Sequence, residues 1–435
     1  MKTTTDTLTT KLESILGRQA IQEDAGVLAA HAVDGMVPSV RVSPQNAAQI
    51  GDVLKVCNEE HAAVVPWGGG TSIGIGNRPS RVDVVVSLQR LNALIEHDDA
   101  NLTATVQAGM CVAALQQILG QRHQFFAIDP PRAAEATIGG VVAANANGPR
   151  RMHYGGVRDQ VIGMKCVLAT GEQVKSGGKV VKNVAGYDMC KLFTGSLGTL
   201  GVITEVTCRV APVPERSASV LAWGTMAQAL KMVEQVEASA LLPSAITVVN
   251  ARAASALFKE SRIRNQGAAV IVWVEGFTEA VERHLTDLRA IARAAGMPDD
   301  TLEDLQQTLW KPIADFAGTT PGPLYRLTLP LGAIGEAIST VDGWSPIPQV
   351  VAHTGAGTLW VAPDVDDVAA GWFARLSALA TSNRGHAIIA AAPPHVKELV
   401  DVWGSPPPGL SVMAEIKRQF DPAGILNPGR FVARL

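Results

Sequence analysis

Apolar and polar positions alternate with two different periods over the first half of the chain. Residues 45–60 place apolar side chains at the spacing of one helix face, and Pro44 fits the first helical position. Runs of β-branched residues and strict alternation predict strands on either side of it. The predicted order is helices at 8–17 and 45–60, strands at 62–66, 82–88 and 101–107, a helix at 111–120, and strands at 161–171 and 202–210. Such mixing of strands and helices favours an α/β arrangement here.

The proline-punctuated segment A-P-V-P-E at residues 211–215 predicts a domain boundary. Beyond it the pattern changes to helices at 227–238, 279–295 and 410–419, and strands at 268–276, 324–329 and 358–361. This pattern favours a second unit with an antiparallel sheet. Proline pairs and triplets at 393–394 and 406–408 punctuate a return segment. We therefore expect three parts: 1–215, 216–390 and 391–435.

Length and charge narrow the class of protein. A chain of 435 residues predicts two or three domains with an ample core. The net charge of −3 gives no electrostatic case for binding nucleic acid or an anionic membrane surface. No apolar run reaches the ~18–20 residues that span a bilayer. The polar N-terminus M-K-T-T-T-D-T-L-T-T lacks the apolar core of a signal peptide, so we expect a cytoplasmic protein.

The cysteines exclude two kinds of site. There are five, an odd number, and no two are spaced C-x-x-C: Cys57, Cys111, Cys166, Cys190 and Cys208. They indicate neither an iron–sulfur site nor a disulfide framework, and reduced thiols are expected. If this chain passes electrons onward, another chain must carry the metal cluster.

The stretch V-V-P-W-G-G-G-T-S-I-G-I-G at residues 64–76 contains a candidate ligand-binding loop. Glycines 68–70 allow positive φ and close approach to bare amides, and a row of N–H groups forms an anion nest. Thr71 and Ser72 add hydroxyl donors. No lysine completes a Walker A motif, and a strand instead of a helix follows, so NAD is not expected. A strand-end loop without a ligand is an equal alternative for this stretch taken alone.

Two further small-residue stretches change that balance. T-I-G-G at 137–140 opens V-V-A-A-N-A-N-G, and G-S-L-G-T-L-G-V-I-T-E at 195–205 runs from a second glycine loop into a strand. In this order and spacing, the three stretches resemble the FAD-binding domain of the vanillyl-alcohol oxidase (PCMH-type) flavoproteins. The resemblance implies an α+β protein, with a two-lobed FAD-binding domain followed by an α+β cap domain that has an antiparallel sheet.

The resemblance also implies which residues contact FAD. In the family the first loop holds the pyrophosphate, the T-I-G-G segment lies along the ribityl chain and pyrophosphate, and backbone near G-V-I contacts the adenosine. The resemblance makes Pro130 a cofactor contact, and an ordinary proline loop without a ligand is an equal alternative. Asn145 either donates its side-chain amide to the cofactor or caps a turn. Because residues 66–72 contain no histidine or cysteine, non-covalent FAD is expected. The implied residues are Pro66, Trp67, Gly68, Gly69, Gly70, Thr71, Ser72, Pro130, Thr137, Ile138, Gly139, Gly140, Asn145, Gly148, Gly198, Gly201, Val202, Ile203 and Asn427.

Three other stretches are similar to the FAD-binding subunits of bacterial glycolate oxidases (glycolate dehydrogenases). They are N-G-P-R-R at 147–151, K-N-V-A-G-Y-D at 182–188 and F-D-P-A-G-I-L-N-P-G-R at 420–430. The similarity covers roughly residues 40–215 and 415–435 and is thin between them. It implies a complex with a related flavin subunit and an iron–sulfur subunit, acting on a small 2-hydroxy acid. Membrane contact would be peripheral, at the inner face of the membrane through those partners.

Oxidation of a 2-hydroxy acid by a flavin needs a cation to hold the carboxylate and a base to take the hydroxyl proton. Arg326, in L-Y-R-L-T-L-P, and His353 are the candidates. The alternatives are a surface charge at a strand edge for Arg326 and a satisfied, buried imidazole for His353. Arg150 and Arg151 lie near the flavin stretches, as cations beside the flavin or as solvated loop charges.

The cap departs from the pattern of the family's catalytic members. Those carry G-H-x-G-D-G-N-x-H and a later E-H-G, which bind a divalent metal beside the substrate. The matching stretch here, A-H-T-G-A-G-T-L-W at 352–360, has Ala356, Thr358 and Trp360 at the other ligand positions, and A-A-A-P at 390–393 replaces E-H-G. No metal site is therefore expected. The leading hypothesis is a FAD-binding subunit of a glycolate dehydrogenase; a stand-alone FAD oxidase and a catalytically inactive structural subunit stay open.

Overall fold

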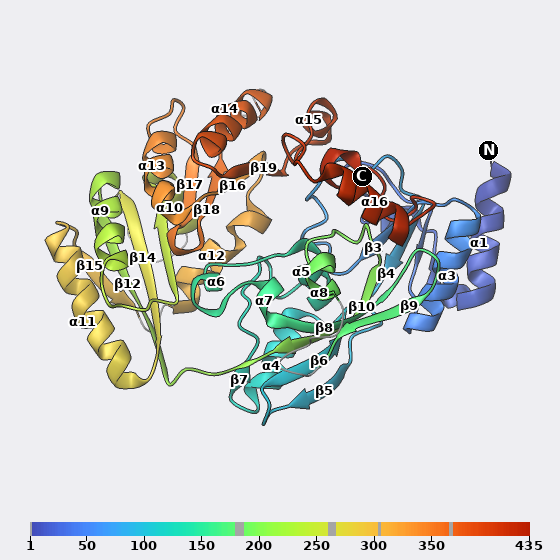
Figure 1. The fold of residues 1–435 in the computed structure, drawn as a ribbon, viewed down its shortest axis with the longest axis horizontal. Coiled ribbons are helices and arrows are strands. Elements are labelled where there is room, and N and C mark those ends of the chain that lie inside the picture. The colour runs from blue at the N-terminus through green and yellow to red at the C-terminus, as the bar shows by residue number, and fades with distance from the viewer. Residues whose placement is uncertain (1, 179–186, 260–266, 303–305, 365–368) are drawn as a thin grey trace.

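The chain folds into two lobes joined near residue 215 (Figure 1). A computed structural model describes residues 2–178, 187–259, 267–302, 306–364 and 369–435. Part of the 182–188 stretch, residues 182–186, therefore lies outside the described residues. Within the described residues, the first lobe holds a four-stranded, a five-stranded and a small two-stranded sheet, and the second lobe holds one eight-stranded sheet. The last segment of the chain crosses back to the first lobe.

The first sheet of the first lobe is four-stranded, in the order β1-β2-β4-β3, and its β2, β4 and β3 run parallel. Its valines point alternately to two cores: Val64 and Val84 pack beneath the helices, and Val65 and Val85 pack with Trp67 on the other face. A parallel sheet buried on both faces explains the continuous apolar runs. The elements are α1 (Lys2–Leu16), β1 (Ile21–Gln22), α2 (Ala25–Ala29), β2 (Val40–Val42), α3 (Ala47–Glu59), β3 (Val64–Trp67) and β4 (Val84–Ser87).

The second sheet of this lobe is antiparallel and five-stranded, in the order β5-β6-β10-β8-β9. A two-stranded pair, β7 with β11, leads towards the second lobe. The elements are β5 (Leu94–Asp98), β6 (Thr103–Gln107), α4 (Val112–Gly120), β7 (Gln124–Phe125), α5 (Ile138–Ala144), α6 (Arg151–Tyr154), α7 (Val157–Gln160), β8 (Val161–Val167), β9 (Gln173–Gly177), α8 (Met189–Phe193), β10 (Val202–Arg209) and β11 (Ala211–Pro212).

The second lobe, the cap, is built on an eight-stranded antiparallel sheet in the order β15-β12-β14-β13-β17-β18-β16-β19. One face packs against α9, α11, α13 and α14, and the other face packs against α10 and α12. The elements are β12 (Arg216–Gly224), α9 (Met226–Glu237), β13 (Ala245–Val249), α10 (Ala251–Leu257), β14 (Ala268–Gly276), α11 (Thr278–Ala294), β15 (Asp299–Leu302), α12 (Gln306–Thr319), β16 (Leu324–Thr328), α13 (Leu331–Asp342), β17 (Gln349–His353), β18 (Thr358–Ala362), α14 (Ala369–Ser382) and β19 (His386–Ala391).

The last segment, with α15 (Pro394–Leu399) and α16 (Leu410–Phe420), connects the two cores. Val396 and Val402 pack in the cap, whereas Leu426 packs in the first lobe. There the chain runs parallel to β3: Val64 N donates to the Ile425 oxygen at 2.8 Å, and Asn427 N donates to the Val64 oxygen at 2.9 Å. The tail thus lies beside the strand that leads into the glycine run and pairs with it.

The α+β fold with an antiparallel cap sheet is confirmed, but some predicted boundaries are wrong. The helix predicted from Gln45 begins at Ala47, because the side chain of Asn46 accepts the Gln49 amide at 2.9 Å and caps it. The strand predicted over 161–171 ends at Val167 in a turn. The small residues after Thr137 form the short helix α5, which was not among the helices predicted from the sequence.

Candidate functional site

A cavity with ≈ 500 Å³ of open space lies in the first lobe, where β3 ends. It is walled by the glycine run, by α5, by the loop before β10 and by the C-terminal tail. A second hollow of ≈ 360 Å³ adjoins it and shares Pro66, Gly68 and Gly140. The structure brings these residues named from the sequence to the walls of one or both: Pro66, Trp67, Gly68, Gly69, Gly70, Thr71, Ser72, Gly139, Gly140, Gly198, Gly201, Ile203 and Asn427.

The amides of the glycine run are available to a ligand. Among the described residues, no acceptor pairs with the backbone N–H groups of residues 68–72, nor do the hydroxyls of Thr71 and Ser72 have a partner. Backbone N–H groups are almost always paired in folded proteins, unless water or a ligand takes their place. A row of free donors on one cavity wall is the geometry that holds phosphate oxygens.

Two glycines of this run are also required by packing within the protein. A Cβ on Gly68 would lie 2.1 Å from Thr137 Oγ1, and one on Gly69 would lie 1.8 Å from the Glu135 oxygen. Gly70 adopts φ +71, a left-handed conformation that favours glycine. The run is therefore pressed against the segment before α5, and substitution at Gly69 would disturb the protein even without a ligand.

The T-I-G-G segment is used mainly for packing. The amides of Ile138 and Gly139 donate to the oxygens of Met110 and Ala108 at 2.8 and 2.7 Å, and Gly140 N reaches Thr137 Oγ1. The structure places Ile138, Val202 and Gly148 in packed positions away from the cavity walls, as it does Thr137 and Pro130. Asn145 ends α5 with φ 49, and its side-chain oxygen accepts from Asn147 at 3.0 Å, which fits the turn-cap alternative.

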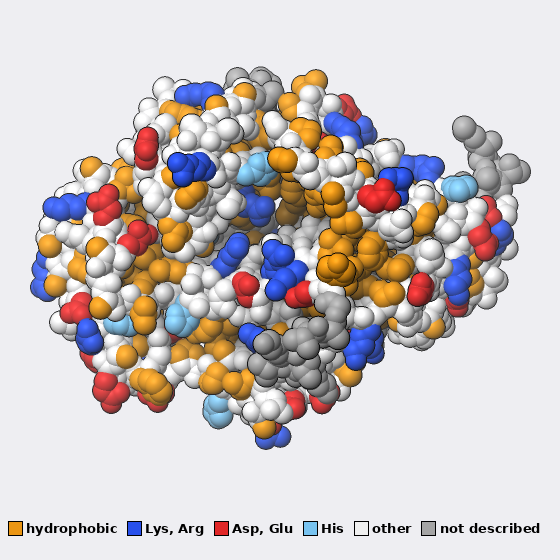
Figure 2. Space-filling view, viewed as in Figure 1, with side chains coloured by type: hydrophobic (Ala, Val, Ile, Leu, Met, Phe, Trp, Pro, Cys, Tyr) orange, Lys and Arg blue, Asp and Glu red, His pale blue; other side chains and the backbone are white. Residues whose placement is uncertain are grey.

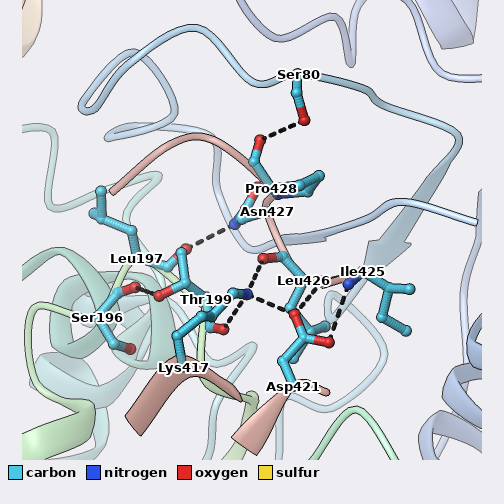
Figure 3. Close-up of polar contacts among 10 residues, drawn as sticks. All are labelled: Ser80, Ser196, Leu197, Thr199, Lys417, Asp421, Ile425, Leu426, Asn427 and Pro428. Carbon is cyan, nitrogen blue, oxygen red and sulfur yellow. Dashed lines mark hydrogen bonds and ion pairs between the residues drawn. The ribbon is translucent and has the colours of Figure 1, made fainter. Parts of the chain in front are cut away.

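The tail reaches the cavity through a buried ion pair (Figure 3). Lys417 Nζ donates to Asp421 at 2.5 Å, to the Leu426 oxygen at 2.9 Å and to the Thr199 oxygen at 2.8 Å. The Asp421 carboxylate in turn accepts the amides of residues 425 and 426. Asn427 Nδ2 donates to the Leu197 oxygen at 2.7 Å, while its Oδ1 is buried without a partner among the described residues. The tail is thus tied to the loop before β10, with one amide oxygen unsatisfied.

A second site lies where the cap faces the first lobe. Paired positions on neighbouring strands share a face of the sheet. Arg326 pairs with Trp360 across β16 and β18, and His353 pairs with Thr247 across β17 and β13, all on the face away from α9 and α11. Helix α6 of the first lobe covers this face: a Cβ on Gly355 would lie 2.2 Å from the Met152 sulfur. Figure 2 shows a hollow between the lobes with Lys and Arg side chains on its wall.

Arg326 is partly buried and its Nε has no partner among the described residues. Its guanidinium lies 5.8 Å from the centre of the Trp360 ring. Burial, and to a lesser extent the charge of Arg151, lower the pKa of Arg326 to about 10. A partly buried cation whose donor has no acceptor in the protein suits an anionic ligand. Arg326 therefore does not fit the alternative of a surface charge at a strand edge.

His353 is only 6 % exposed, and its Nδ1 lies 2.9 Å from Thr247 Oγ1. Burial lowers the pKa of this imidazole to about 4, so it is neutral at pH 7. The structure therefore places Arg326 and His353 on one face of the cap, two strands apart. In the described residues no three His, Cys, Asp or Glu side chains gather as metal ligands, and the bulky Trp360 stands on this face.

Arg150 joins the lobes and is not available to a ligand. It makes a bidentate ion pair with Glu275 of β14, at 2.9 and 3.0 Å, and its guanidinium lies over the rings of Phe125, Tyr154 and Trp273. The exposed neighbour Arg151 is the cation that faces Arg326. Of the two arginines, Arg150 is thus held in an ion pair between the lobes, whereas Arg151 stays exposed.

Known protein families match both lobes. Residues 38–177 match the family described as "FAD binding domain", and residues 213–317 and 404–431 match "FAD linked oxidases, C-terminal domain". A D-lactate dehydrogenase of Archaeoglobus fulgidus is 31% identical over 91% of this chain and 92% of its own length. This chain belongs to the FAD-linked oxidase family.

A further relative and a solved structure also resemble this FAD-linked oxidase. The glycolate oxidase subunit GlcD of Bacillus subtilis is 27% identical over 92% of this chain and 90% of its own length. Among solved structures, p-cresol methylhydroxylase with bound substrate superposes with a TM-score of 0.75 and 15% identity, covering 99% of this chain and 97% of that one. That likeness shows the PCMH-type fold, which confirms the family resemblance seen in the sequence.

The residues of the cavity fit the FAD that the family binds. The free N–H groups of residues 68–72 suit a diphosphate, and the unpaired Asn427 Oδ1 suits a donor group. Ala143, Ala144, Leu197 and Arg430 also line the cavity and were missed. The small-residue run could have indicated the two alanines, and Leu197 and Arg430 lie inside the 195–205 and 420–430 stretches that carry the family resemblance. None of the helices in the described part of the FAD-linked oxidase combines the length and apolar character needed to cross a membrane.

Replacement of Lys417 by methionine should loosen the tail of the FAD-linked oxidase. Asp421 would stay buried without its cation, and breaking such a pair costs about 3–5 kcal/mol. We expect a lower midpoint of urea denaturation and faster release of FAD. Arg418→Met is the matched control, because Arg418 is exposed and pairs only with Glu415. Equal midpoints for the two variants would contradict a role for Lys417 in holding the tail.

Replacement of His353 by glutamine should remove part of the acid sensitivity of folding. The folded-state pKa of about 4 lies below the unfolded value near 6.5, so only the unfolded chain binds this proton in between. The stabilisation is present above pH 6.5 and is lost as the pH falls to 4, by about 3 kcal/mol. Urea denaturation at several pH values measures this. The exposed His386→Gln is the control, and an equally steep acid limb in His353→Gln would refute the assignment.

Proposed function

We propose that this protein is a FAD-dependent 2-hydroxy acid dehydrogenase subunit that oxidises glycolate to glyoxylate. One observation carries the proposal: Arg326 lies partly buried on the same cap face as His353, and its Nε has no partner among the described residues. An unpaired guanidinium beside an imidazole suits a small hydroxy acid, and the charge of Arg151 adds to the positive potential there. Two relatives are named as a glycolate oxidase subunit and a D-lactate dehydrogenase, which supports the substrate class.

The residues of this chain would hold and orient the substrate. Bound FAD supplies the acceptor for the hydride from the hydroxyl-bearing carbon. Arg326 would bind the carboxylate through its free Nε edge, with Arg151 adding charge. His353, kept neutral by burial and held by Thr247, would take the hydroxyl proton, and a carboxylate bound nearby would raise its low pKa. We propose non-covalent FAD, because the described lining residues of both cavities include no histidine, cysteine or tyrosine.

We propose that the electrons leave through an iron–sulfur partner subunit, in a complex that also contains a related flavin subunit. All five cysteines are free, four of them buried, and no group of them is placed to hold a cluster within the described chain. The relative from Bacillus subtilis is itself named a subunit. Both observations favour an arrangement in which another chain carries the cluster.

A second candidate is a flavoprotein subunit that no longer turns over substrate. Ala356, Thr358 and Trp360 stand where the family's catalytic members have metal ligands, and burial makes His353 a weak base. The free amides of residues 68–72 speak for retained cofactor binding in either case.

An anaerobic absorbance spectrum of the purified chain, before and after glycolate, tests the proposal. Bleaching of the flavin bands by glycolate supports oxidation at this chain. Flavin that glycolate cannot reduce, either alone or after co-purification with partner subunits, would overturn the proposed activity and leave the non-catalytic candidate. D-lactate and L-lactate added in parallel define the substrate.

A further inference from the structure

Three charged side chains are buried behind the loop that follows the glycine run. Lys397 is 1 % exposed, Arg430 is 2 % exposed, and the side chain of Asp34 is 8 % exposed. Lys397 Nζ donates to Asp34 Oδ1 at 2.8 Å and to the Gly74 oxygen at 2.6 Å. Arg430 Nη2 donates to the oxygens of residues 73 and 75. Lys397 and Arg430 therefore both donate to backbone oxygens of the loop at residues 73–75.

The cluster carries more positive than negative charge. Two cations face one carboxylate. Burial lowers the pKa of Lys397, the Asp34 carboxylate partly offsets this, and the charge of Arg430 lowers the pKa further. Asp34 pairs with Lys397 but makes no hydrogen bond to Arg430, whose guanidinium has no ion-pair partner in the described chain. The nearby Arg78 does not alter this balance, because it pairs with Glu398. One positive charge is left over.

Arg430 is the member of the cluster that reaches the cofactor cavity. It lines the cavity together with the glycine run and Asn427. Only its Nη2 is engaged; Nε and Nη1 make no hydrogen bond to the described residues, and Nε is fully buried. A buried cation without a counter-ion is costly, and so is a buried donor without an acceptor. Arg430 is therefore an uncompensated cation that lines the same cavity as the free amides of residues 68–72.

We propose that Arg430 is a ligand of the FAD diphosphate, and that Lys397 and Asp34 set the charge behind it. The inference rests on the cofactor assignment and adds to it a cation supplied by the C-terminal tail. The amides of residues 68–72 bind phosphate oxygens by geometry, and Arg430 supplies the net charge that neutral amides lack. The tail is thereby part of the cofactor site, in addition to pairing with β3.

A purely structural role makes different predictions. Arg430 could serve only to hold the oxygens of residues 73 and 75. In that case neutralising Asp34 would only weaken the cluster and the site. If surplus charge binds the diphosphate, neutralising Asp34 leaves two uncompensated cations and strengthens the attraction for an anion. The two roles therefore predict opposite signs for Asp34→Asn.

The test measures the affinity of the full chain, stripped of flavin, for FAD, ADP and adenosine. We expect Arg430→Met to weaken FAD and ADP on the order of 10–100-fold, with Arg430→Lys recovering most of the loss and adenosine unchanged. Asp34→Asn should bind ADP about 3–10-fold more tightly. Arg418→Gln, an exposed charge on the same tail that pairs with Glu415, is the matched control and should bind as the wild type does.

Several results would overturn the inference. One is an affinity of Arg430→Met for ADP equal to that of the wild type, or an equal loss in the Met and Lys variants. Weaker or unchanged ADP binding by Asp34→Asn is another. If Asp34→Asn does not fold, the comparison of the Met and Lys variants still decides. None of these measurements involves a hydroxy acid, so failure here leaves the proposed activity untouched, and failure of flavin bleaching leaves this inference untouched.

Discussion

Replacement of Ala143 by phenylalanine should abolish FAD binding while the fold is kept. Ala143 lies on α5 and lines both the main cavity and the hollow beside it. A phenyl ring there would fill the space in front of the free amides of residues 68–72. Each hydrogen bond to a charged group contributes about 1.5–3 kcal/mol, so losing two or three weakens binding by at least about 10²-fold. The measurement is the flavin-to-protein ratio of the purified chain.

The control for this variant is Ala114→Phe, which adds the same ring to the exposed face of α4. It should keep its flavin. Ala143→Phe is a sharper probe than any change at Gly69, whose Cβ would collide with the Glu135 oxygen in the absence of cofactor. A full flavin content in Ala143→Phe, with an unchanged denaturation midpoint, would show that FAD does not occupy this cavity.

The cofactor loop could be read from sequence because its requirements are local. Gly68–Gly70 are needed for a left-handed turn and for close approach of Thr137, and both needs leave a mark in the sequence. The cap sheet was readable for the same reason, since residues 268–276 show a strand pattern that the structure reproduces as β14. Periodicity and glycine placement are properties of single segments.

The features of the site that could not be predicted from the sequence depend on contacts between distant segments. Asp34 and Lys397 are 363 positions apart, and Thr247 meets His353 across 106 positions. Arg151 faces Arg326 only because α6 docks on the cap. No local pattern distinguishes Arg150, which is locked by Glu275, from the exposed Arg151 beside it. Ile138 and Val202 match the family's cofactor stretches, yet both side chains are fully buried in the core.

Replacement of Arg326 by methionine should abolish flavin reduction by 2-hydroxy acids without loss of FAD. The variant keeps the length and apolar stem that pack beside Trp360 but removes the cation and its free Nε. Two charge-assisted hydrogen bonds to a carboxylate contribute about 3–6 kcal/mol together, so the second-order rate of bleaching should fall on the order of 10²–10⁴-fold. Stopped-flow absorbance under anaerobic conditions measures this rate.

The cap offers a matched control in Arg375→Met. Arg375 also lies over a tryptophan, Trp344 at 3.9 Å, but on α14, which covers the opposite face of the sheet. Its replacement should leave the bleaching rate unchanged, because any field from that side is screened by the sheet and solvent. Arg326→Lys should recover part of the rate, since lysine keeps the charge without the bidentate fork. Equal rates in Arg326→Met and wild type would move the carboxylate site away from the cap, to Arg151 alone or to a partner subunit.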